Sequence, residues 1–113
     1  MKLIIAIIQP NKLDNVMDAL DEKEIYLRTV NNVLGCGRQK GISEVYRGVV
    51  ESGRLLRKIR LEIAVNDSYV EPAIQAIVKA AKTGQIGDGK IFVLELQQCV
   101  RIRTEERDGV AIG

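Results

Sequence analysis

The order of hydrophobic patterns limits the fold of this chain more than any other feature, because the same order occurs twice. A short apolar or β-branched run is followed by a stretch with helical spacing and then by a second strand-like run. The six segments are residues 3–8, 13–20, 25–36, 59–65, 70–81 and 91–96. Two strand-helix-strand units predict an α+β chain with the order βαββαβ, in which both helices cover one face of an antiparallel sheet.

This order is that of the ferredoxin-like, or split βαβ, plan. The first strand adds a constraint, because the run from Leu3 to Ile8 is apolar on both of its faces. Strands that are buried on both faces read as continuous apolar runs. A single layer of two helices hides only one face, so we expect copies of the same chain to bury the other in a closed ring or barrel.

Both helices carry signals for their ends. Asn11 is placed to cap the first helix. Ser68 and Glu71 resemble a capping box for the second helix, with Pro72 in its first turn and Gly84 as the residue that ends it. The buried stripes are expected to be Leu13, Val16, Met17 and Leu20 in the first helix, and Val70, Ile74, Ile77, Val78 and Ala81 in the second.

The composition indicates one globular domain over residues 1–113, with 46% hydrophobic and 28% charged residues. The formal charge of +2 is too small to indicate a nucleic-acid-binding protein, and the chain has no histidine. Residues 1–9 are apolar but too few to span a bilayer and lack a cleavage site, so we expect a cytoplasmic protein without direct membrane insertion. Cys36 and Cys99 form no metal or redox motif and are expected to be ordinary buried or half-buried thiols, although the sequence leaves a disulfide open.

The segment from Arg38 to Leu56 has no clear period and contains three glycines, which predicts a long exposed loop between strands two and three. Loops of this length in a small domain are usually functional. From Arg38 to Arg60 the chain has an excess of five positive charges. The seven basic residues are Arg38, Lys40, Arg47, Arg54, Arg57, Lys58 and Arg60, and the two acidic ones are Glu44 and Glu51. Such an arm suits an acidic partner surface or a nucleotide.

The stretch from Thr83 to Val93 has glycines at 84, 87 and 89 followed by Lys90, where a helical pattern gives way to a strand pattern. Glycines allow positive φ, so several backbone N–H groups can point at one anion, and the lysine adds a positive charge. The spacing matches the first seven positions of a Walker A motif. Ile91 replaces the Ser or Thr that would hold magnesium, which excludes a P-loop NTPase. An ordinary connection with a surface lysine fits the spacing alone equally well.

Four motifs follow one another at fixed separations along the chain. They are Gly-Cys-Gly-Arg-Gln-Lys-Gly at residues 35–41, Tyr-Arg-Gly at 46–48, Thr-Gly-Gln-Ile-Gly-Asp-Gly-Lys-Ile-Phe-Val at 83–93 and Arg-Ile-Arg-Thr at 101–104. Together they closely resemble the PII nitrogen-regulatory signal proteins, and the match covers essentially the whole chain. The resemblance implies a homotrimer whose sheets form a central barrel, with ATP or ADP in each cleft between subunits.

The resemblance also implies which residues contact the nucleotide. The family's B-loop, about residues 82–90, lies over the phosphates, and the tail, about residues 101–113, reaches in from the adjacent subunit. The implied contacts are Thr29, Gly35, Gly37, Arg38, Glu62, Ala64, Gly87, Asp88, Gly89, Lys90, Arg101 and Arg103, of which Thr29, Glu62 and Ala64 match the adenine edge. From the residues alone, Glu62 is equally one half of a surface ion pair with Arg60, worth about 0–1 kcal/mol.

A second ligand, 2-oxoglutarate, is implied to bind together with Mg-ATP. Gln39 matches the contact to Mg²⁺ and to a carboxylate of this ligand, and Lys58 matches the contact to its distal carboxylate. Gly87 also belongs to this implied site. From the residues alone, Lys58 is one more charge in the basic run that ends at Arg60.

The long loop corresponds to the family's T-loop, about residues 37–56, which docks on an ammonium transporter, a nitrogen-metabolism enzyme or nitrogenase. Family members are modified at positions that match Val49 and Glu51, and neither side chain has a hydroxyl group. We therefore expect the loop to be controlled by ligands, without uridylylation or phosphorylation at its tip. Ser52 keeps a modification nearby open.

The implied function is a sensor of ATP, ADP and 2-oxoglutarate that regulates nitrogen-metabolism proteins through the T-loop. The alternative is a dedicated adenine-nucleotide sensor with a weak or absent response to 2-oxoglutarate. An enzyme is disfavoured, since the chain has no histidine and shows no catalytic dyad. An RNA-binding sheet is disfavoured, since Phe92 is the only phenylalanine and tryptophan is absent.

Overall fold

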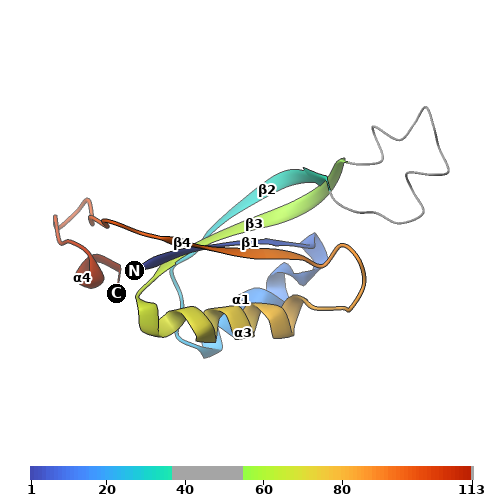
Figure 1. The fold of residues 1–113 in the computed structure, drawn as a ribbon, viewed down its shortest axis with the longest axis horizontal. Coiled ribbons are helices and arrows are strands. Elements are labelled where there is room, and N and C mark those ends of the chain that lie inside the picture. The colour runs from blue at the N-terminus through green and yellow to red at the C-terminus, as the bar shows by residue number, and fades with distance from the viewer. Residues whose placement is uncertain (37–54, 113) are drawn as a thin grey trace.

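The computed structural model describes residues 1–36 and 55–112. Its strands are β1 (Lys2–Ile8), β2 (Thr29–Cys36), β3 (Leu55–Val65) and β4 (Gly89–Glu95), and its α-helices are α1 (Leu13–Glu22), α3 (Val70–Ala81) and the short α4 (Gly109–Ile112). Two 3-10 turns, η1 (Pro10–Lys12) and η2 (Asp67–Tyr69), precede α1 and α3. The predicted α+β order is confirmed, and Figure 1 shows α1 and α3 on one side of the sheet.

The sheet has the strand order β2-β3-β1-β4, and all neighbouring strands pair antiparallel. β1 pairs with β3 from Lys2 opposite Val65 to Ile8 opposite Ile59. It pairs with β4 on its other side, where Ile8 lies opposite Gly89. Each long helix thus connects two strands that are separated by a strand of the other unit. This interleaving is the split βαβ plan, and it places the loop before β4 beside the end of β1.

The core lies between the two long helices and one face of the sheet. On β1, Ile4, Ala6 and Ile8 are at most 2% exposed. The other buried members are Ile59, Leu61, Ile63 and Val65 of β3, Val16 and Leu20 of α1, Ala73, Ala76, Ile77 and Ala81 of α3, and Ile25. The predicted stripe of α3 is wrong at Val78, which is 42% exposed. Small alanines face the sheet instead and allow the helix to approach it closely.

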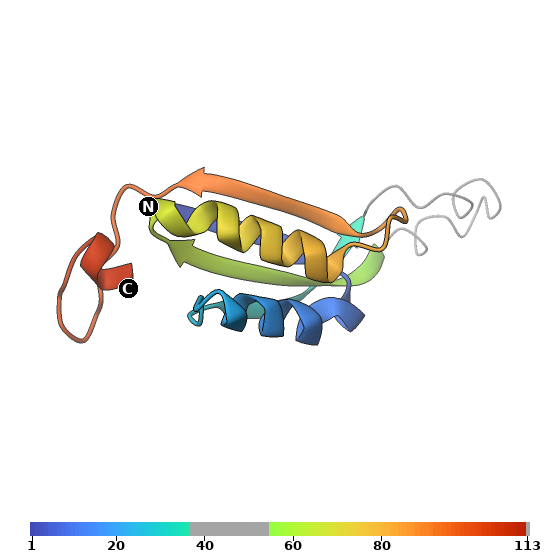
Figure 2. The same ribbon diagram turned by 90° about the horizontal axis from the view of Figure 1, so that it is seen from below.

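The opposite face of the sheet is also apolar over β1 and β4. Leu3, Ile5 and Ile7 are only half-buried there, and Phe92 and Leu94 are 48% and 46% exposed. The register places Phe92 opposite Ile5 and Leu94 opposite Leu3, and directly opposite residues share a face. Figure 2 shows both long helices lying across the other side of the sheet. The apolar second face that the first-strand pattern predicted is present, and its burial by further copies stays a prediction.

The predicted helix caps are wrong for both long helices. α1 and α3 begin after Lys12 and Tyr69, without a side-chain capping bond, so neither Asn11 nor Ser68 is a cap. The 3-10 turns supply backbone bonds instead, 3.0 Å long in η1 and 2.9 Å long in η2. Pro72 lies in the first turn of α3, as predicted. The longest described helix has 12 residues, and none in the described part is long and apolar enough to cross a bilayer.

β2 and β3 differ from their predicted bounds at one end each. β2 begins at Thr29 rather than at residue 25, because the chain first turns around the end of α1. Glu24 has a φ of 60° in that turn, and Ile25 is buried beside the helix. β3 begins at Leu55 rather than at residue 59, because it stays paired with β2 as far as Cys36. The two strands therefore extend beyond the end of β1, as Figure 1 shows.

The junction between α3 and β4 also differs from the prediction. α3 ends at Ala81, and Lys82 already has an extended backbone, so Gly84 is not the residue that ends the helix. Gly84 has a φ of 88° and lies within the loop that follows the helix. β4 begins at Gly89 rather than at residue 91, since Gly89 already pairs with Ile8.

The chain after β4 does not continue as a strand through the Arg-Ile-Arg motif. Val100 and Arg107 form an isolated bridge, and residues 102–104 form a turn between them. Asn66 Nδ2 donates to Gly109 O over 3.2 Å and attaches α4 to the end of β3. Arg101 and Arg103 therefore do not lie on a strand.

Candidate functional site

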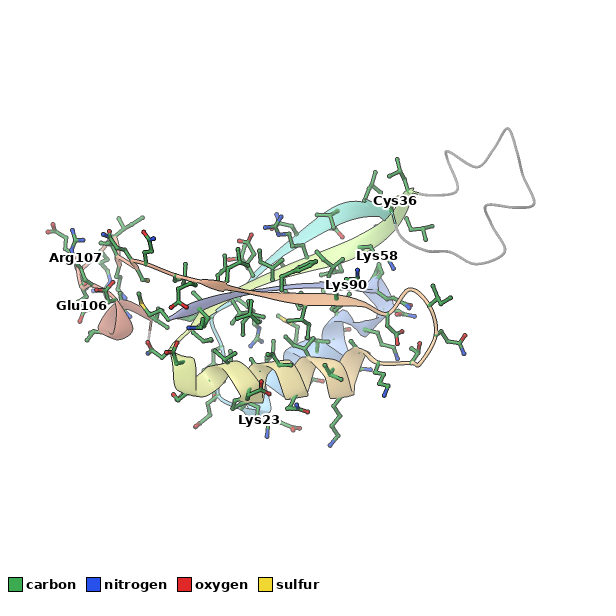
Figure 3. All side chains as sticks on the ribbon, viewed as in Figure 1. Lys23, Cys36, Lys58, Lys90, Glu106 and Arg107 are labelled. Carbon is green, nitrogen blue, oxygen red and sulfur yellow. The ribbon has the colours of Figure 1, made fainter. Side chains whose placement is uncertain are left out.

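A cleft of about 990 Å³ opens on the helix-free face of the sheet. Ligand pockets in proteins commonly measure roughly 300–1,000 Å³. The cleft is lined by residues of all four strands and of the loop before β4, namely Ile7, Val33, Leu34, Gly35, Cys36, Lys58, Arg60, Ile86, Gly87, Gly89, Lys90 and Phe92. Five of these were predicted from the sequence as ligand contacts. In Figure 3, Lys58, Lys90 and Cys36 lie at the same end of the sheet.

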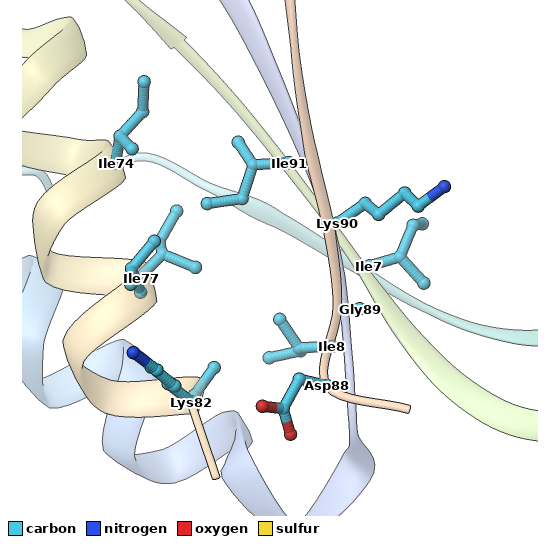
Figure 4. Close-up of a pocket in the computed structure, with 11 residues that line it drawn as sticks. Ile7, Ile8, Ile74, Ile77, Lys82, Asp88, Gly89, Lys90 and Ile91 are labelled. Carbon is cyan, nitrogen blue, oxygen red and sulfur yellow. The ribbon is translucent and has the colours of Figure 1, made fainter. Parts of the chain in front are cut away.

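The glycine-rich loop has the left-handed backbone that its sequence predicted. Gly84, Gly87 and Gly89 have φ angles of 88°, 109° and 107°. At Gly89 an added Cβ would lie 1.7 Å from the carbonyl oxygen of Ile7, so only glycine fits between β4 and β1. Figure 4 shows Lys90 pointing away from α3 and Ile91 pointing towards it. The loop thus turns its lysine to the cleft and its isoleucine to the core.

Asp88 uses its side chain inside this loop. Its carboxylate accepts hydrogen bonds from the backbone N–H groups of Thr83 and Gly84 at 2.8 and 2.9 Å, and from the Thr83 hydroxyl at 2.5 Å. The Thr83 hydroxyl bond, followed by the two backbone bonds, holds the pKa of this carboxyl below its usual value. A carboxylate that faced a phosphate would repel it. The bonds to Thr83 and Gly84 instead hold the Asp88 carboxylate against the loop's own backbone.

Lys58 lies across the cleft from this loop and touches it. Its Nζ donates to the carbonyl oxygen of Gly87 over 2.9 Å. The stem of Lys58 passes Gly35, where an added Cβ would lie 3.1 Å from the lysine Cγ. Glycine at position 35 therefore leaves room for the lysine to cross the face of the sheet.

The predicted adenine contacts lie on the same face, further along the sheet. Thr29 is directly opposite Glu62 in the pairing of β2 with β3, and Ala64 follows two residues later on the same side. Glu62 also forms the ion pair that the sequence left open, with 2.8 Å between its Oε2 and NH2 of Arg60. The pair is partly exposed and contributes about 0–1 kcal/mol, so a ligand can displace it at little cost.

Arg101 and Arg103 follow the end of β4 that is farther from the glycine-rich loop. Arg101 NH1 is 2.7 Å from Glu106 Oε1, and Arg101 NH2 donates to Ala111 O over 3.1 Å. Figure 3 places Glu106 at the end of the molecule opposite Lys90. β4 alone separates Lys90 from its last residue by five positions, about 17 Å at roughly 3.3 Å per residue. The structure therefore does not bring these arginines to the glycine-rich loop of their own chain.

Several predicted contacts lie outside the described residues. They are Gly37, Arg38 and Gln39 of the site, together with Val49, Glu51 and Ser52 of the loop tip. Residues 1–36 and 55–112 contain no group of three or more Cys, Asp or Glu side chains that could hold a metal ion. Cys36 and Cys99 are free thiols; Cys99 is partly buried as predicted, whereas the prediction is wrong for Cys36, which is exposed at the end of β2.

A second, smaller pocket of about 330 Å³ lies on the helix side of β4. Figure 4 shows its lining, which includes Ile74 and Ile77 of α3 and Ile91 of β4. Asp88 and Lys82 stand at one end of it. This pocket is mostly apolar, and of the residues that the sequence assigned to a ligand it contains Asp88, Gly89 and Lys90.

Gln9 is a site residue that the sequence did not indicate. Its Nε2 donates to Gly87 O over 3.3 Å, so it contacts the same oxygen atom as Lys58. It follows β1 directly and precedes Pro10, at a position where a glutamine has no recognisable motif. The apolar run that ends there was the available signal, since it fixes where β1 stops.

The fold and the cleft together define an α+β protein of the ferredoxin-like plan with an anion-compatible loop on its uncovered face. The family model described as "Nitrogen regulatory protein P-II" matches residues 1–106. The nitrogen regulatory protein P-II of Azospirillum brasilense is 53% identical over 112 residues, and that of Rhizobium etli is 51% identical. The nitrogen regulatory protein GlnK of Escherichia coli is 48% identical. Each alignment covers 99% of this chain and 100% of the relative.

The chain therefore belongs to the P-II family of nitrogen regulatory proteins. The resemblance drawn from the four sequence motifs is confirmed. Members of this family are regulatory signalling proteins, so nitrogen regulation and signal transduction define the class of function of the chain.

Proposed function

We propose that this protein senses ATP, ADP and 2-oxoglutarate in clefts between three copies of the chain and regulates partner proteins through residues 37–56. The observation that carries the proposal is the meeting of two lysines and a positive-φ glycine loop at one cleft on the uncovered sheet face. Backbone N–H groups and ammonium groups both favour a polyphosphate. We assign the chain a regulatory role, without catalysis, in the cytoplasm.

The division of the predicted contacts supports assembly of the site from neighbouring copies. Lys90 lies beside the cleft, whereas Arg101 lies at the far end of the same chain with Glu106. A second copy placed end to end can bring its Arg101 and Arg103 to this cleft. The apolar residues of the uncovered sheet face supply the surface that such copies would bury. A closed trimer would bring the arginines of one copy to the cleft of the next and would bury the uncovered sheet face of every copy.

In this arrangement the phosphates lie over residues 87–90, and the adenine edge lies against Thr29, Glu62 and Ala64. The chemistry of the described part of the chain fits the nucleotide better than it fits a metal ion alone. Mg²⁺ prefers six oxygen ligands and commonly takes most of them from phosphates and water. We assign the protein contact to Gln39, and a bound ion would supply positive charge that offsets the charge of the phosphates and of the carboxylate ligand.

Lys58 is proposed to hold the distal carboxylate of 2-oxoglutarate. The segment that carries the signal begins directly after Cys36, and its last two residues are the first two of β3, so both of its ends join strands of the cleft. A ligand that favours one arrangement of this segment by a few kcal/mol is enough to switch partner binding. An ammonium transporter, a nitrogen-metabolism enzyme or nitrogenase is the proposed partner. Control without covalent modification at residues 49 and 51 stays a prediction.

A dedicated adenine-nucleotide sensor is the second candidate function. One observation favours it, since the ammonium of Lys58 donates a hydrogen bond to Gly87 O. A carboxylate must compete with that contact, which weakens the response to 2-oxoglutarate.

Calorimetric titration with Mg-ATP, ADP and 2-oxoglutarate, separately and in combination, tests the proposal. We expect Mg-ATP and ADP to compete for one site per chain and 2-oxoglutarate to bind only when Mg-ATP is present. Competition between the nucleotides without any 2-oxoglutarate binding would establish the second candidate. Absence of nucleotide binding would contradict both.

A further inference from the structure

The carbonyl oxygen of Gly87 accepts two side-chain hydrogen bonds. Lys58 Nζ donates to it from β3 over 2.9 Å, and Gln9 Nε2 donates from the end of β1 over 3.3 Å. A carbonyl oxygen has two lone pairs, so both donors can bind at once. The two bonds connect the glycine-rich loop to two different strands of the sheet.

These bonds differ in kind from those that close the loop. The carboxylate of Asp88 binds Thr83 and Gly84, which are members of the same loop, so it shapes the loop without attaching it to β1 or β3. Gly87 has a φ of 109°, and its peptide orientation follows from where its carbonyl is held. The bonds from Lys58 and Gln9 therefore fix the orientation of the peptide group that joins Gly87 to Asp88.

The two donors are not equivalent when an anion enters. A carboxylate carries a full negative charge, so it attracts an ammonium more strongly than a neutral carbonyl does. A carboxylate at Lys58 therefore draws the ammonium away from Gly87 O. Gln9 is neutral and half-buried, so the anion does not attract it in the same way.

We propose that Gln9 is the positioning residue that holds Gly87 in place when Lys58 turns to a carboxylate ligand. It keeps the glycine-rich loop in its nucleotide-binding shape at that moment and so transmits the favourable coupling between Mg-ATP and 2-oxoglutarate. This inference rests on the proposed function and names the side chain that lets the two ligands share one loop.

The test is a double-mutant cycle with Gln9→Met and Lys58→Met, read by calorimetry with Mg-ATP. Methionine keeps the length of both side chains and removes the donor. Without 2-oxoglutarate, Gln9→Met alone should weaken Mg-ATP binding by about twofold, since Lys58 still holds Gly87. In the Lys58→Met background the same change should weaken it by about tenfold, because a partly buried carbonyl is then left without a donor.

A second arm uses the unmodified Lys58. With saturating 2-oxoglutarate, Gln9→Met should lower the Mg-ATP affinity by about tenfold, and by linkage it should lower the 2-oxoglutarate affinity by the same factor as it lowers the coupling. Gln75→Met is the matched control, because it makes the same substitution at an exposed position of α3, outside the glycine-rich loop. That variant should bind both ligands as the natural chain does.

Equal weakening of Mg-ATP binding by Gln9→Met in all three settings would overturn the inference, because it would indicate a general structural role. Unchanged affinity in all three would overturn it as well. Failure of the natural chain to bind Mg-ATP would instead end the proposed function. A natural chain that couples the two ligands while Gln9→Met couples them normally would end this inference alone.

Discussion

Lys58 Nζ lies 2.9 Å from the carbonyl oxygen of Gly87, so the lysine predicted to bind the effector touches the loop predicted to bind the nucleotide. The two residues are 29 positions apart in the sequence and come from β3 and from the loop before β4. Any anion that moves the ammonium of Lys58 also changes what holds Gly87. The proposed effector site and the proposed nucleotide site are therefore joined directly, by the hydrogen bond from Lys58 Nζ to Gly87 O.

Lys58→Met should weaken 2-oxoglutarate binding in the presence of Mg-ATP by about tenfold or more. The change removes a charge-assisted hydrogen bond, worth roughly 1.5–3 kcal/mol. Calorimetry at saturating Mg-ATP measures the effect, and Lys79→Met at an exposed position of α3 is the control for loss of one charge. Normal 2-oxoglutarate binding by Lys58→Met would contradict the assignment.

Lys90→Ala should weaken ATP and ADP binding alike, by roughly 1.5–3 kcal/mol or about tenfold to a hundredfold. Lys90 is exposed at the cleft and points away from α3, so its loss leaves the core intact. Competition titrations with both nucleotides measure the change. Unchanged affinity for either nucleotide would place its phosphates away from this loop.

Asp88 should make the stability of the protein depend on acid pH. Its carboxyl pKa is held below the ordinary value of 3.8, first by the Thr83 hydroxyl, so its contribution is complete above about pH 4 and is lost as the pH falls through the lower folded-state value. The unfolding midpoints of the natural chain and of Asp88→Asn should therefore converge as the pH falls below 3.8. Asp18→Asn, on the exposed side of α1, controls for loss of one charge. A constant difference from pH 7 to pH 3 would show that the carboxylate does not close the loop.

Gly89→Ala should destabilise the chain more than Gly84→Ala does. Both residues have positive φ, which costs about 1–2 kcal/mol for alanine. Only at Gly89 would the new methyl group meet the backbone, 1.7 Å from Ile7 O, whereas nothing lies within 4 Å at Gly84. We expect a loss of at least about 3 kcal/mol in the free energy of unfolding for Gly89→Ala, measured by urea denaturation. Equal losses for the two variants would show that the β1–β4 approach is not tight.

The natural chain should sediment at about three times its mass of 12.5 kDa at micromolar concentration. The reason is the apolar sheet face that α1 and α3 leave uncovered, with Phe92 and Leu94 nearly half-exposed. Phe92→Lys should shift the equilibrium towards smaller species, because it would bury a charge in the contact. Glu95→Lys, at the exposed end of the same strand, is the control. A natural chain that sediments as a monomer would remove the intersubunit cleft and the nucleotide site with it.

The fold could be predicted from the sequence because the spacing of the apolar residues distinguishes the strands from the helices. The apolar run of β1 and the helical spacing of α3 both predicted the correct type of element, and the expected uncovered face follows from β1 alone. The ends of elements were less predictable. The 3-10 turns before α1 and α3 satisfy backbone groups with backbone partners, so these helix starts have no side-chain signature. The caps predicted at Asn11 and Ser68 were wrong for this reason.

The site was predictable where its chemistry lies in adjacent residues and less so where it depends on pairing. The loop from Gly84 to Lys90 could be identified from its glycines. That Thr29 lies opposite Glu62, and that Gln9 and Lys58 meet at one oxygen atom, depends on the register of three strands. Register is fixed by the packing of the whole sheet, and no local motif contains it.

The eleven-residue strand β3 sets the distances between the predicted contacts of the site. Lys58, Glu62 and Ala64 lie on one side of this strand, four and two residues apart, and its first two residues belong to the segment proposed to carry the signal. Because successive side chains alternate between faces, one residue inserted between Lys58 and Glu62 would send one of the two into the core. Side chains in this strand can be exchanged singly, but its length can change only in steps of two if Lys58, Glu62 and Ala64 are to stay on one face, so the number of residues between them sets the separation of the proposed ligand contacts.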